Sequence, residues 1–579
     1  SIKKSGFQMK SKFQFRIRLL FALVLIAASV LAANLYIVQI VKGEAFKDKA
    51  ERQYISPKES IFDRGKIYFS NKDGTLLSAA TVKSGFTLAI NPKKIVNPQD
   101  VYKKISAIAP IDEAKFLMKA SKTDDPYEEL EKRISEEKAK EIDSLDISGV
   151  ELQRDKWRIY PGGKMAANTL GFVGYDGKSF SGRYGLERYY EDILKRDESE
   201  AYVNFFAEIF SNINKAVTSK GRKDGDIITT IEPTVQSFFE KEVASTSLKW
   251  HSKLTLGVIM NPMNGEIYSL VVDPTFDPNT YGSESDIKIF GNPVVESIFE
   301  MGSIIKSLTM AAGLDAGAVT AETTYDDKGS LTLNGSTISN YDHKGNGVIN
   351  MQTVLNKSVN TGVAYVVSKM GKDNFAKYMI DFGLGRETGI DLPGEANGRI
   401  SNLKSPRDIE YATASFGQGI AMTPIATARA LSALANGGVL VIPHIVKKID
   451  YKIGLSKNIF YGENENKRVI KKETSDEITR MLVKVVDTAL LDGTVKIQNY
   501  SVAAKTGTAQ IAKPGGGGYY DDRYLHSFFG YFPAYNPRFL IFLMILEPKG
   551  APYASNTLTT PFMDTVKFLT NYYEVPPDR

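Results

Sequence analysis

The hydrophobic positions first mark out one long apolar stretch near the start of the chain, from residue 19 to residue 41, which carries no charge. A helix of that length, rising about 1.5 Å per residue, would span about 34 Å and cross a hydrocarbon core of about 30 Å. The alternative is a cleaved signal peptide, because Ala32 and Ala33 are small. Apolar residues continue beyond them through Val38, so we expect a single transmembrane anchor.

A mixed region follows, from residue 42 to residue 228. The run Phe86 to Ile90 is typical of a short strand. Between Asp112 and Asp143 the charges recur at i,i+4 spacing, which predicts a solvated helix. We expect this region to be a non-catalytic pedestal of mixed α/β structure.

From residue 229 to residue 579 the pattern is that of a large α+β domain with an antiparallel sheet flanked by helices. Strands are predicted at 254–260 and 266–272, joined by a tight hairpin at Asn264-Gly265, and again at 527–532 and 539–546. Helical periodicity covers 304–314 and 351–370, and a last helix is expected at 561–572. We expect the catalytic chemistry in this domain.

Composition and charge restrict the partners of the protein. The chain has 579 residues, 24% of them charged, with a formal net charge of +6, which does not favour nucleic acid as the main partner. Residues 1–18 carry basic and no acidic side chains, so they are expected to remain in the cytoplasm. The rest, after the anchor, would then lie outside the cytoplasm, in the periplasmic space.

Several kinds of reaction centre are poorly supported. The chain has no cysteine, which excludes thiolate metal sites and a cysteine nucleophile. Its four histidines are scattered, without a short metal-binding spacing, and no GxSxG motif is present. We therefore expect no metal and no cofactor, and a serine chemistry in which lysine is the base.

The first candidate motif is Ser303-Ile304-Ile305-Lys306. On a helix, residues i and i+3 share a face, so a neutral lysine could take the proton of the serine hydroxyl. The SxxK pattern occurs five times in the chain and is weak alone. Ser303 differs from the others because it follows Gly302 and opens an apolar run, which places it at a buried helix N-terminus.

Two further motifs lie downstream of Ser303. Ser358-Val359-Asn360 is an SxN, and Lys505-Thr506-Gly507-Thr508 contains the KTG that occurs once in the chain. The second follows an apolar run typical of a strand; its glycine would admit a substrate backbone, and its Lys505 and Thr506 could hold a carboxylate. Each motif is weak alone, but the three in this order and spacing are specific.

These motifs resemble those of penicillin-binding proteins and serine β-lactamases. The remaining sequence narrows the resemblance, over nearly the whole chain, to monofunctional class B penicillin-binding proteins, the peptidoglycan D,D-transpeptidases. The stretches that carry the narrower resemblance are IFDRGKIYFSNKDGTLLSAA (61–80), YGLERYYEDIL (184–194), NPMNGEIYSLVVDPTFDPN (261–279), DFGLGRETGIDLPGE (381–395), SFGQGIAMTP (415–424) and FFGYFPAYNPRF (528–539).

The resemblance implies a role for each matching residue of the first two motifs. Ser303 is similar to the acylated nucleophile and Lys306 to its base. Ser358 resembles the residue that passes a proton to the leaving amine, and Asn360 the one that orients Lys306 and the substrate amide. Met301 departs from the family, which usually has proline before the glycine.

The third motif matches the family's substrate-binding strand. Lys505 and Thr506 resemble the pair that docks the terminal carboxylate of a D-Ala-D-Ala stem peptide. Gly507 and Thr508, the next two residues of the motif, belong to the same substrate-binding strand. The backbone N–H groups of Ser303 and Thr508 resemble the oxyanion hole. Arg64, Gly65 and Glu187 match pedestal motifs, for which the expected role is structural.

The resemblance implies an enzyme that cross-links stem peptides, is acylated by β-lactams, and belongs to the septal cell-division type. It implies a SEDS-type polytopic glycosyltransferase and other division proteins as partners, with Tyr36 and Gln39 of the anchor as candidate contacts. The alternatives are an elongation-type transpeptidase, a carboxypeptidase or β-lactamase, a bifunctional class A enzyme, and a membrane penicillin sensor without turnover.

Overall fold

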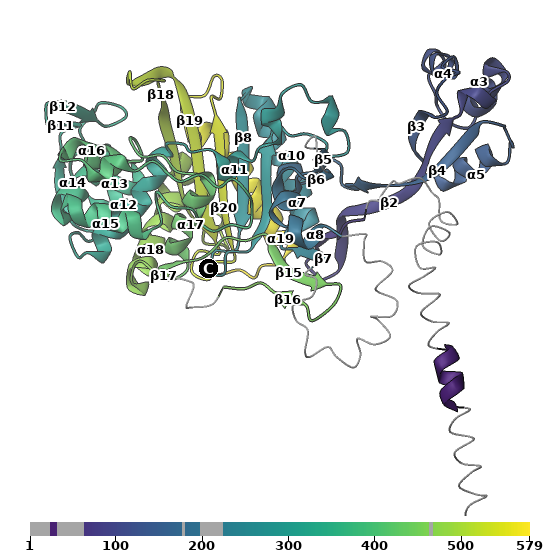
Figure 1. Cartoon of the computed structure of the whole chain (residues 1–579). Helices are drawn as coiled ribbons and strands as arrows, with labels where there is room; N and C mark the ends of the chain where they lie inside the picture. Colours follow the sequence, from purple (N-terminus) through teal and green to yellow (C-terminus); the bar gives the residue numbers. More distant parts are fainter. Residues whose placement is uncertain (1–23, 32–62, 176–179, 197–223, 462–466) are drawn as a thin grey trace, which may run out of the picture. The chain divides into compact units, whose positions relative to one another are not determined.

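The computed structural model describes residues 24–31, 63–175, 180–196, 224–461 and 467–579 (Figure 1). The predicted anchor lies outside the described residues except for 24–31, which are helical. None of the helices within these ranges is long and apolar enough to cross a membrane. Contacts divide the chain into two compact units: residues 85–155 belong to the first, and residues 63–84 and 156–579 form the second. The predicted domain boundary at residue 229 stays a prediction, because these units are defined by contacts and not by sequence domains.

The first unit is a small α/β unit built around the end of one long strand. Its core is formed by Leu88, Ile105, Phe116, Leu130 and Ile142, which are nearly fully buried. The strand β2 pairs with both β3 and β4. The elements are β2 (Leu76–Ile90), α3 (Pro98–Ser106), α4 (Glu113–Ala120), β3 (Glu128–Ile134), α5 (Glu136–Asp143) and β4 (Val150–Ile159).

The helix predicted from Asp112 to Asp143 is wrong in its centre. Two helices, α4 and α5, flank the strand β3, which pairs antiparallel with β2. The charges on β3 suggested a helix, but Leu130 and Ile134 enter the core from this strand. Glu128, also nearly buried, is paired with Lys122 at 2.5 Å. Burial against β2 therefore overrides the local helical pattern.

Within the described part of the second unit, a five-stranded antiparallel sheet has the order β18-β19-β20-β8-β9. The sequence of strand β20 is apolar throughout because both of its faces are buried. Phe539, Ile541 and Leu543 belong to one hydrophobic cluster, and Leu540 and Phe542 belong to another. Both faces of the sheet are thus covered. The strands are β8 (Leu254–Met260), β9 (Ile267–Asp273), β18 (Ala503–Ala512), β19 (Tyr519–Phe532) and β20 (Phe539–Leu546).

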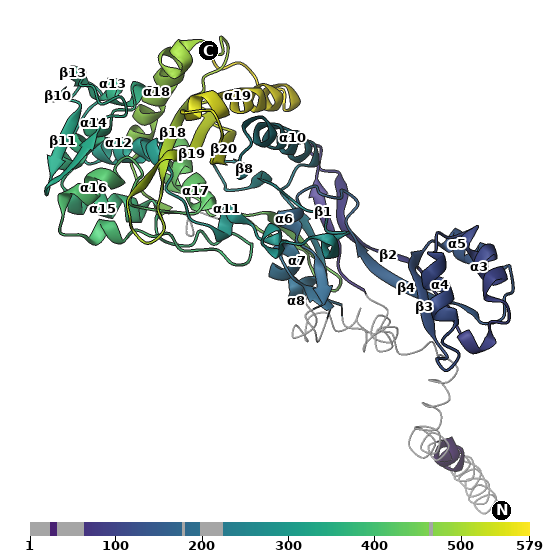
Figure 2. The same cartoon turned by 90° about the horizontal axis from the view of Figure 1, so that it is seen from above.

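Helices form a layer on each face of this sheet (Figure 2). On one face lie α10 (Pro233–Trp250) and α19 (Ala554–Tyr572). The helical block on the other face comprises α11 (Pro293–Glu296), α12 (Lys306–Asp315), α13 (Met351–Asn356), α14 (Asn360–Met370), α15 (Lys372–Asp381), α16 (Asp408–Ala414), α17 (Pro424–Ala435) and α18 (Lys472–Thr488).

Smaller elements complete the second unit. The strand β1 lies between the start of β2 and β7, and β7 pairs in turn with β15 and β15 with β16. Among the described residues, four two-stranded sheets are formed by β5 with β6, β10 with β13, β11 with β12, and β14 with β17. Their bounds are β1 (Ile67–Ser70), β5 (Val173–Tyr175), β6 (Phe180–Gly182), β7 (Gly225–Thr229), β10 (Thr324–Asp327), β11 (Ser330–Leu333), β12 (Ser336–Ser339), β13 (Gly347–Asn350), β14 (Val439–Leu440), β15 (Val446–Tyr451), β16 (Lys457–Asn458) and β17 (Lys467–Arg468), with the short helices α6 (Ala167–Leu170), α7 (Gly185–Tyr189) and α8 (Glu191–Leu194).

Several predicted boundaries differ from the structure. Strand β19 begins at Tyr519 and not at Ser527, and β2 begins at Leu76 and not at Phe86. The connection between β8 and β9 runs from Asn261 to Glu266 and is longer than the tight hairpin predicted, with a positive φ (84°) at Gly265 but not at Asn264. The side chain of Asn264 instead accepts a hydrogen bond from Glu266 N–H. The last helix begins at Ala554, seven residues before the expected start at Pro561, which lies inside it.

The pedestal residues singled out in the sequence lie in a buried ion cluster of the second unit. The carboxylate of Glu187, fully buried, lies 2.6 Å from Nε of Arg64 and 2.6 Å from Nε of Arg158, and accepts a bond from the Tyr160 hydroxyl. Arg158 also donates to the carbonyl of Gly65. The opposite charges are paired at nearly full burial, although Nη2 of Arg158 has no hydrogen-bond partner among the described residues. Removal of one charged partner should therefore be costly.

Candidate active site

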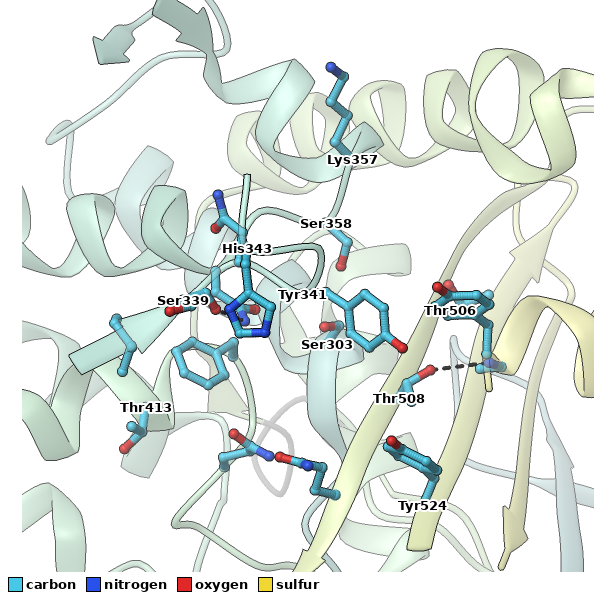
Figure 3. Close-up of a pocket in the computed structure, with 18 of the residues that line it drawn as sticks. Ser303, Ser339, Tyr341, His343, Lys357, Ser358, Thr413, Thr506, Thr508 and Tyr524 are labelled. Atoms are coloured by element: carbon cyan, nitrogen blue, oxygen red, sulfur yellow. Dashed lines mark hydrogen bonds between the residues drawn. The ribbon is translucent and has the colours of Figure 1, made fainter. Parts of the chain in front are cut away.

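All three sequence motifs meet at one cavity of about 700 Å³ in the second unit. Figure 3 shows Ser303, Ser358 and Thr508 around this space. Among the predicted site residues, those that line it are Ser303, Ser358, Asn360, Thr506 and Thr508. Lys306 and Lys505 are buried, with 0% and 3% of their surface exposed, directly behind the lining residues.

Ser303 lies on a tight 3₁₀ turn, η6 (Gly302–Ile305), that leads into α12. In such a turn residues three apart stack on one side, which brings Lys306 to the side of Ser303. Gly302 has a φ of 66°, and a Cβ there would lie 3.0 Å from the carbonyl of Thr508. A glycine is therefore needed at this position, because the turn packs closely against the strand that carries the KTG motif.

Gly507 is needed for the same close contact between the strand β18 and the turn that carries Ser303. A Cβ at this position would lie 2.5 Å from Oγ of Ser527, 2.9 Å from the carbonyl of Met301 and 3.0 Å from the amide nitrogen of Ile304. The glycine thus admits the nucleophile-bearing turn, whereas the sequence had suggested that it admits the substrate. Ser527, which is fully buried, also donates to the Met301 carbonyl at 2.7 Å and ties the turn to β19.

The hydroxyl of Ser358 lies between the two buried lysines. Nζ of Lys306 is 3.1 Å and Nζ of Lys505 is 3.0 Å from Oγ of Ser358. Lys306 also donates to the carbonyl of Ser358, and Lys505 to the carbonyl of Thr506. In this arrangement the lysine of the first motif, the serine of the second and the lysine of the third form a continuous hydrogen-bonded chain.

Burial changes the proton affinity of both lysines. It lowers the pKa of Lys306 well below its ordinary value, and the nearby positive charge of Lys505 lowers it further. Burial also lowers the pKa of Lys505, to about 8. Lys306 is thus the group that gives up its proton more readily, as a base requires, while Lys505 can still carry a charge near neutral pH.

Ser358 occupies a backbone conformation that the sequence did not predict. The single helix expected over 351–370 is divided into α13 and α14, and Ser358, between them, has a φ of 55°. A non-glycine residue in this left-handed region is strained by about 1–3 kcal/mol and is held there by its surroundings. Asn360, the first residue of α14, donates from Nδ2 to the carbonyl of Ser339 at 2.8 Å.

Two family models match the chain. The penicillin binding protein transpeptidase domain matches residues 255–566, which include all three motifs. The chain belongs to this family. A second model, the penicillin-binding protein dimerisation domain, matches residues 62–230. Together the matches confirm the predicted class B penicillin-binding protein, and with it a serine-type transpeptidase.

Relatives of this family span most of the chain. Stage V sporulation protein D of Bacillus subtilis is 33% identical over 544 residues, which cover 93% of this chain and 82% of that protein. The peptidoglycan D,D-transpeptidase FtsI of Buchnera aphidicola is 27% identical and covers 84% of this chain and 85% of its own length.

Solved structures of penicillin-binding proteins share the fold. Penicillin-binding protein 3 of Mycobacterium tuberculosis, complexed with aztreonam, superposes with a TM-score of 0.67 at 24% identity, over 90% of this chain and 98% of that one. Penicillin-binding protein 2X of Streptococcus thermophilus gives a TM-score of 0.71 at 19% identity, over 89% of this chain and 80% of that one. The catalytic region, predicted as an α+β domain with an antiparallel sheet flanked by helices, has the mixed α/β transpeptidase fold of these proteins.

Sequence reasoning missed several residues of this transpeptidase site. Tyr341 and Tyr524, labelled in Figure 3, line the cavity together with Tyr553. The rings of Tyr341 and Tyr553 meet edge to face, with 5.0 Å between their centroids. With 29 tyrosines in the chain, no local signal distinguishes these three. Ser527 also has no local signal, because its role depends on the hydrogen bond to the carbonyl of Met301, 226 positions away in the sequence. Gln418 lines the cavity from the stretch 415–424, which the resemblance had already marked.

Proposed function

We propose that the cavity cross-links peptidoglycan stem peptides through an acyl-enzyme on Ser303. The observation that carries this function is the hydrogen-bonded chain Lys306–Ser358–Lys505 beside Ser303 in one cavity. It provides a nucleophile, a base of lowered pKa and a route for protons, which are what acyl transfer from an amide to an amine requires.

In the first step, the terminal carboxylate of a D-Ala-D-Ala donor docks on Lys505 and Thr506. Ser303 Oγ attacks the penultimate D-Ala carbonyl, and its proton passes to Lys306. The backbone N–H groups of Ser303 and Thr508 stabilise the oxyanion that forms. The C–N bond then breaks, its nitrogen receives a proton through Ser358, and D-Ala leaves.

In the second step, the amine of a neighbouring stem peptide attacks the ester carbonyl of the acyl-enzyme. The amine loses a proton through the same chain of residues, and the C–O bond to Ser303 breaks. The oxygen of Ser303 regains its proton, and a new peptide bond joins the two stems. A β-lactam would enter the first step as a mimic of the donor and remain on Ser303.

Transfer to an amine distinguishes this function from a carboxypeptidase, a β-lactamase and a penicillin sensor. The test supplies purified protein with a D-alanyl thioester donor and a D-amino acid acceptor, beside a Ser303→Ala variant. Formation of the transfer product by the unchanged protein alone supports a transpeptidase. Hydrolysis without transfer would support a carboxypeptidase, and acylation by penicillin without turnover of the donor would support a sensor.

A septal role is the finer proposal. It is supported by the relative named FtsI and by the Ala89-Ile90-Asn91-Pro92-Lys93 segment, which resembles the septal type. Depletion of the protein in its own cells tests it: filaments with blocked septa are the expected result. Rounded cells that still divide would favour the elongation type.

The same proposal places residues 1–18 in the cytoplasm, the anchor in the cytoplasmic membrane and the catalytic domain outside it. We propose that Tyr36 and Gln39 of the anchor contact a SEDS-type glycosyltransferase, since they are polar positions in an apolar stretch. Co-purification should be lost when the anchor is exchanged for an unrelated one. Unchanged co-purification would contradict this contact.

A further inference from the structure

A buried carboxylate outside the three motifs collects hydrogen bonds from several separate segments. Asp327, at the end of β10 and 2% exposed, accepts bonds through Oδ1 from Gly329 N–H, Asn340 Nδ2 and the Thr361 hydroxyl, at 2.7 to 3.0 Å. Oδ2 accepts from Asn340 Nδ2 and from both the backbone and the side chain of Asn346, at 2.7 to 3.0 Å. Every acceptor position of the carboxylate is thus used.

These donors keep Asp327 ionised. Burial alone would raise its pKa, but the hydrogen bonds from Asn346, Gly329, Thr361 and Asn340 outweigh burial and lower that pKa. The proton of the Thr361 hydroxyl lies on the 2.7 Å bond to Asp327, so the hydroxyl of Tyr325, 3.1 Å away, must donate to Thr361. The donors of Gly329, Asn340, Asn346 and Thr361 thus all point at the carboxylate, and Tyr325 reaches it through Thr361.

The network joins two segments that form one wall of the active-site cavity. Thr361 directly follows Asn360 of the SxN motif, and its N–H also donates to Oδ1 of Asn340 at 3.2 Å. Asn340 follows Ser339, whose carbonyl accepts the bond from Asn360 Nδ2. Ser339, Asn340 and Asn360 all line the cavity (Figure 3 labels Ser339), so Asp327 connects the loop after β12 to the start of α14 from behind.

The same wall carries the strained residue of the site. Ser358, with its φ of 55°, lies three positions before Thr361 and has no side-chain helix cap to support it, since Val359 occupies the N-cap of α14. A strained backbone persists only where the surroundings fix it. The bonds from Lys306 fix Ser358 on the cavity side, and those from Thr361 to Asp327 fix the following turn on the other side.

We propose that Asp327 is a positioning residue for the reaction, which holds Ser358 and Asn360 in their working geometry through Thr361 and Asn340. It touches no reacting atom. The inference rests on the proposed function, because it concerns the rate at which Ser303 is acylated. Figure 3 shows Thr506 and Thr508 of the docking strand β18 across the cavity from Ser339. Lys505 donates to Ser358 but is also held by the carbonyl of Thr506 on its own strand. The network should therefore affect the acylation step more than the binding of a carboxylate.

The test uses Asp327→Asn in the full chain, with Asp326→Asn as the matched control. Asp326 is the preceding residue of β10, with 58% of its side chain exposed and a long 3.8 Å contact to Lys328. In Asp327→Asn an NH₂ group replaces one acceptor and faces the donors of Asn340 and Asn346. Stopped-flow acylation by a reporter penicillin separates the acylation rate constant from the dissociation constant of the first complex.

A shift of the wall by less than about 1 Å is enough to lower the acylation rate constant of Asp327→Asn about 10- to 100-fold while the dissociation constant changes less than about threefold. Asp326→Asn should behave as the unchanged protein. A folded Asp327→Asn variant with an unchanged acylation rate constant would overturn the proposal, and so would a loss confined to the dissociation constant. If the unchanged protein itself is not acylated, the proposed function fails and not this inference.

A second pair of variants decides the matter if Asp327→Asn does not fold. Thr361→Val keeps the shape of the side chain and removes the hydroxyl that donates to Asp327, whereas Thr361→Ser keeps the hydroxyl. The valine variant should lose acylation rate and the serine variant should retain most of it. Equal rates in the two variants would overturn the proposal, because packing alone would then explain the site.

Discussion

Replacement of Lys306 by methionine separates the chemistry of the site from its packing. Lys306 is fully buried, and burial together with the charge of Lys505 lowers its pKa, so it is poised to be neutral when it meets the hydroxyl of Ser303. Methionine has nearly the same volume, fills the same space and cannot accept the proton. We therefore expect Lys306→Met to fold normally and to lose its reaction with penicillin.

The size of the expected loss follows from the role. A positioned general base contributes about 10²- to 10⁴-fold to a rate, which corresponds to about 3–5 kcal/mol of the barrier. Part of the loss would come from Ser358, whose strained backbone gives up the hydrogen bond from Lys306. The free energy of unfolding should change by less than about 1.5 kcal/mol, because the substitution conserves volume and removes a buried amine.

The assay is the acylation rate constant for a reporter penicillin as a function of pH. In the unchanged protein this constant should rise as pH increases through the pKa of Lys306, because the neutral amine is the active form. Lys306→Met should be slow and lose this rise. The control is Ser307→Ala, since among the described residues the buried hydroxyl of Ser307 has no hydrogen-bond partner and its removal should leave the rate unchanged. A folded Lys306→Met protein that reacts within about twofold of the unchanged rate would refute the role of base.

Three further outcomes are expected. The second-order rate constant of acylation by carboxylate-bearing β-lactams should fall as pH rises above about 8, because Lys505 then loses its charge. Lys505→Arg should lack that fall, and a fall of the same shape in both proteins would point to another group. Glu187→Gln should lower the free energy of unfolding by about 3–5 kcal/mol in denaturant titrations, against little change for the exposed Glu137→Gln. The reason is that buried Arg158 loses its counter-charge, while Arg64 keeps only its 2.6 Å contact with the partly exposed Glu191. Gly507→Ala should slow acylation about tenfold or more, since its Cβ would lie 2.9 Å from the carbonyl of Met301 and displace the nucleophile-bearing turn, and unchanged kinetics would show that the turn can shift without cost.

The catalytic motifs could be predicted because their spacing is a property of the sequence itself. Residue type and order predict Ser303, Ser358 and Lys505 as site residues. In the structure Ser303 and Ser358 line one cavity, and Lys505 is hydrogen-bonded to Ser358 behind it. The strands of the main sheet were equally clear. The run 539–546 is apolar at every position because both of its faces are buried, and burial of that kind leaves its mark on each residue.

The errors arose where a distant contact decides the local structure. Residues 128–134 carry the charges of a solvated helix, yet Leu130 and Ile134 are drawn into a strand by pairing with β2. The helix predicted over 351–370 is interrupted at Ser358, whose strain is maintained by Lys306 and by the segment that follows it. Local patterns do not report such constraints.

The residues that support the site could not be predicted from the sequence for the same reason. Ser527 holds the carbonyl of Met301, and Asp327 gathers Asn340 and Thr361, but serine and aspartate at these positions are ordinary in a sequence. Their importance lies in hydrogen bonds between segments far apart in the chain. Sequence reasoning therefore identified the reacting groups, and the structure adds what holds them in place.

The central claim is that Ser303 is the residue that becomes acylated. Purified protein is treated with a fluorescent penicillin beside a Ser303→Ala variant, and the labelled peptide is located by mass spectrometry. The account predicts one adduct, on Ser303, that is absent from the variant while the fold is retained. Label on another residue, or label that persists in Ser303→Ala, would contradict it.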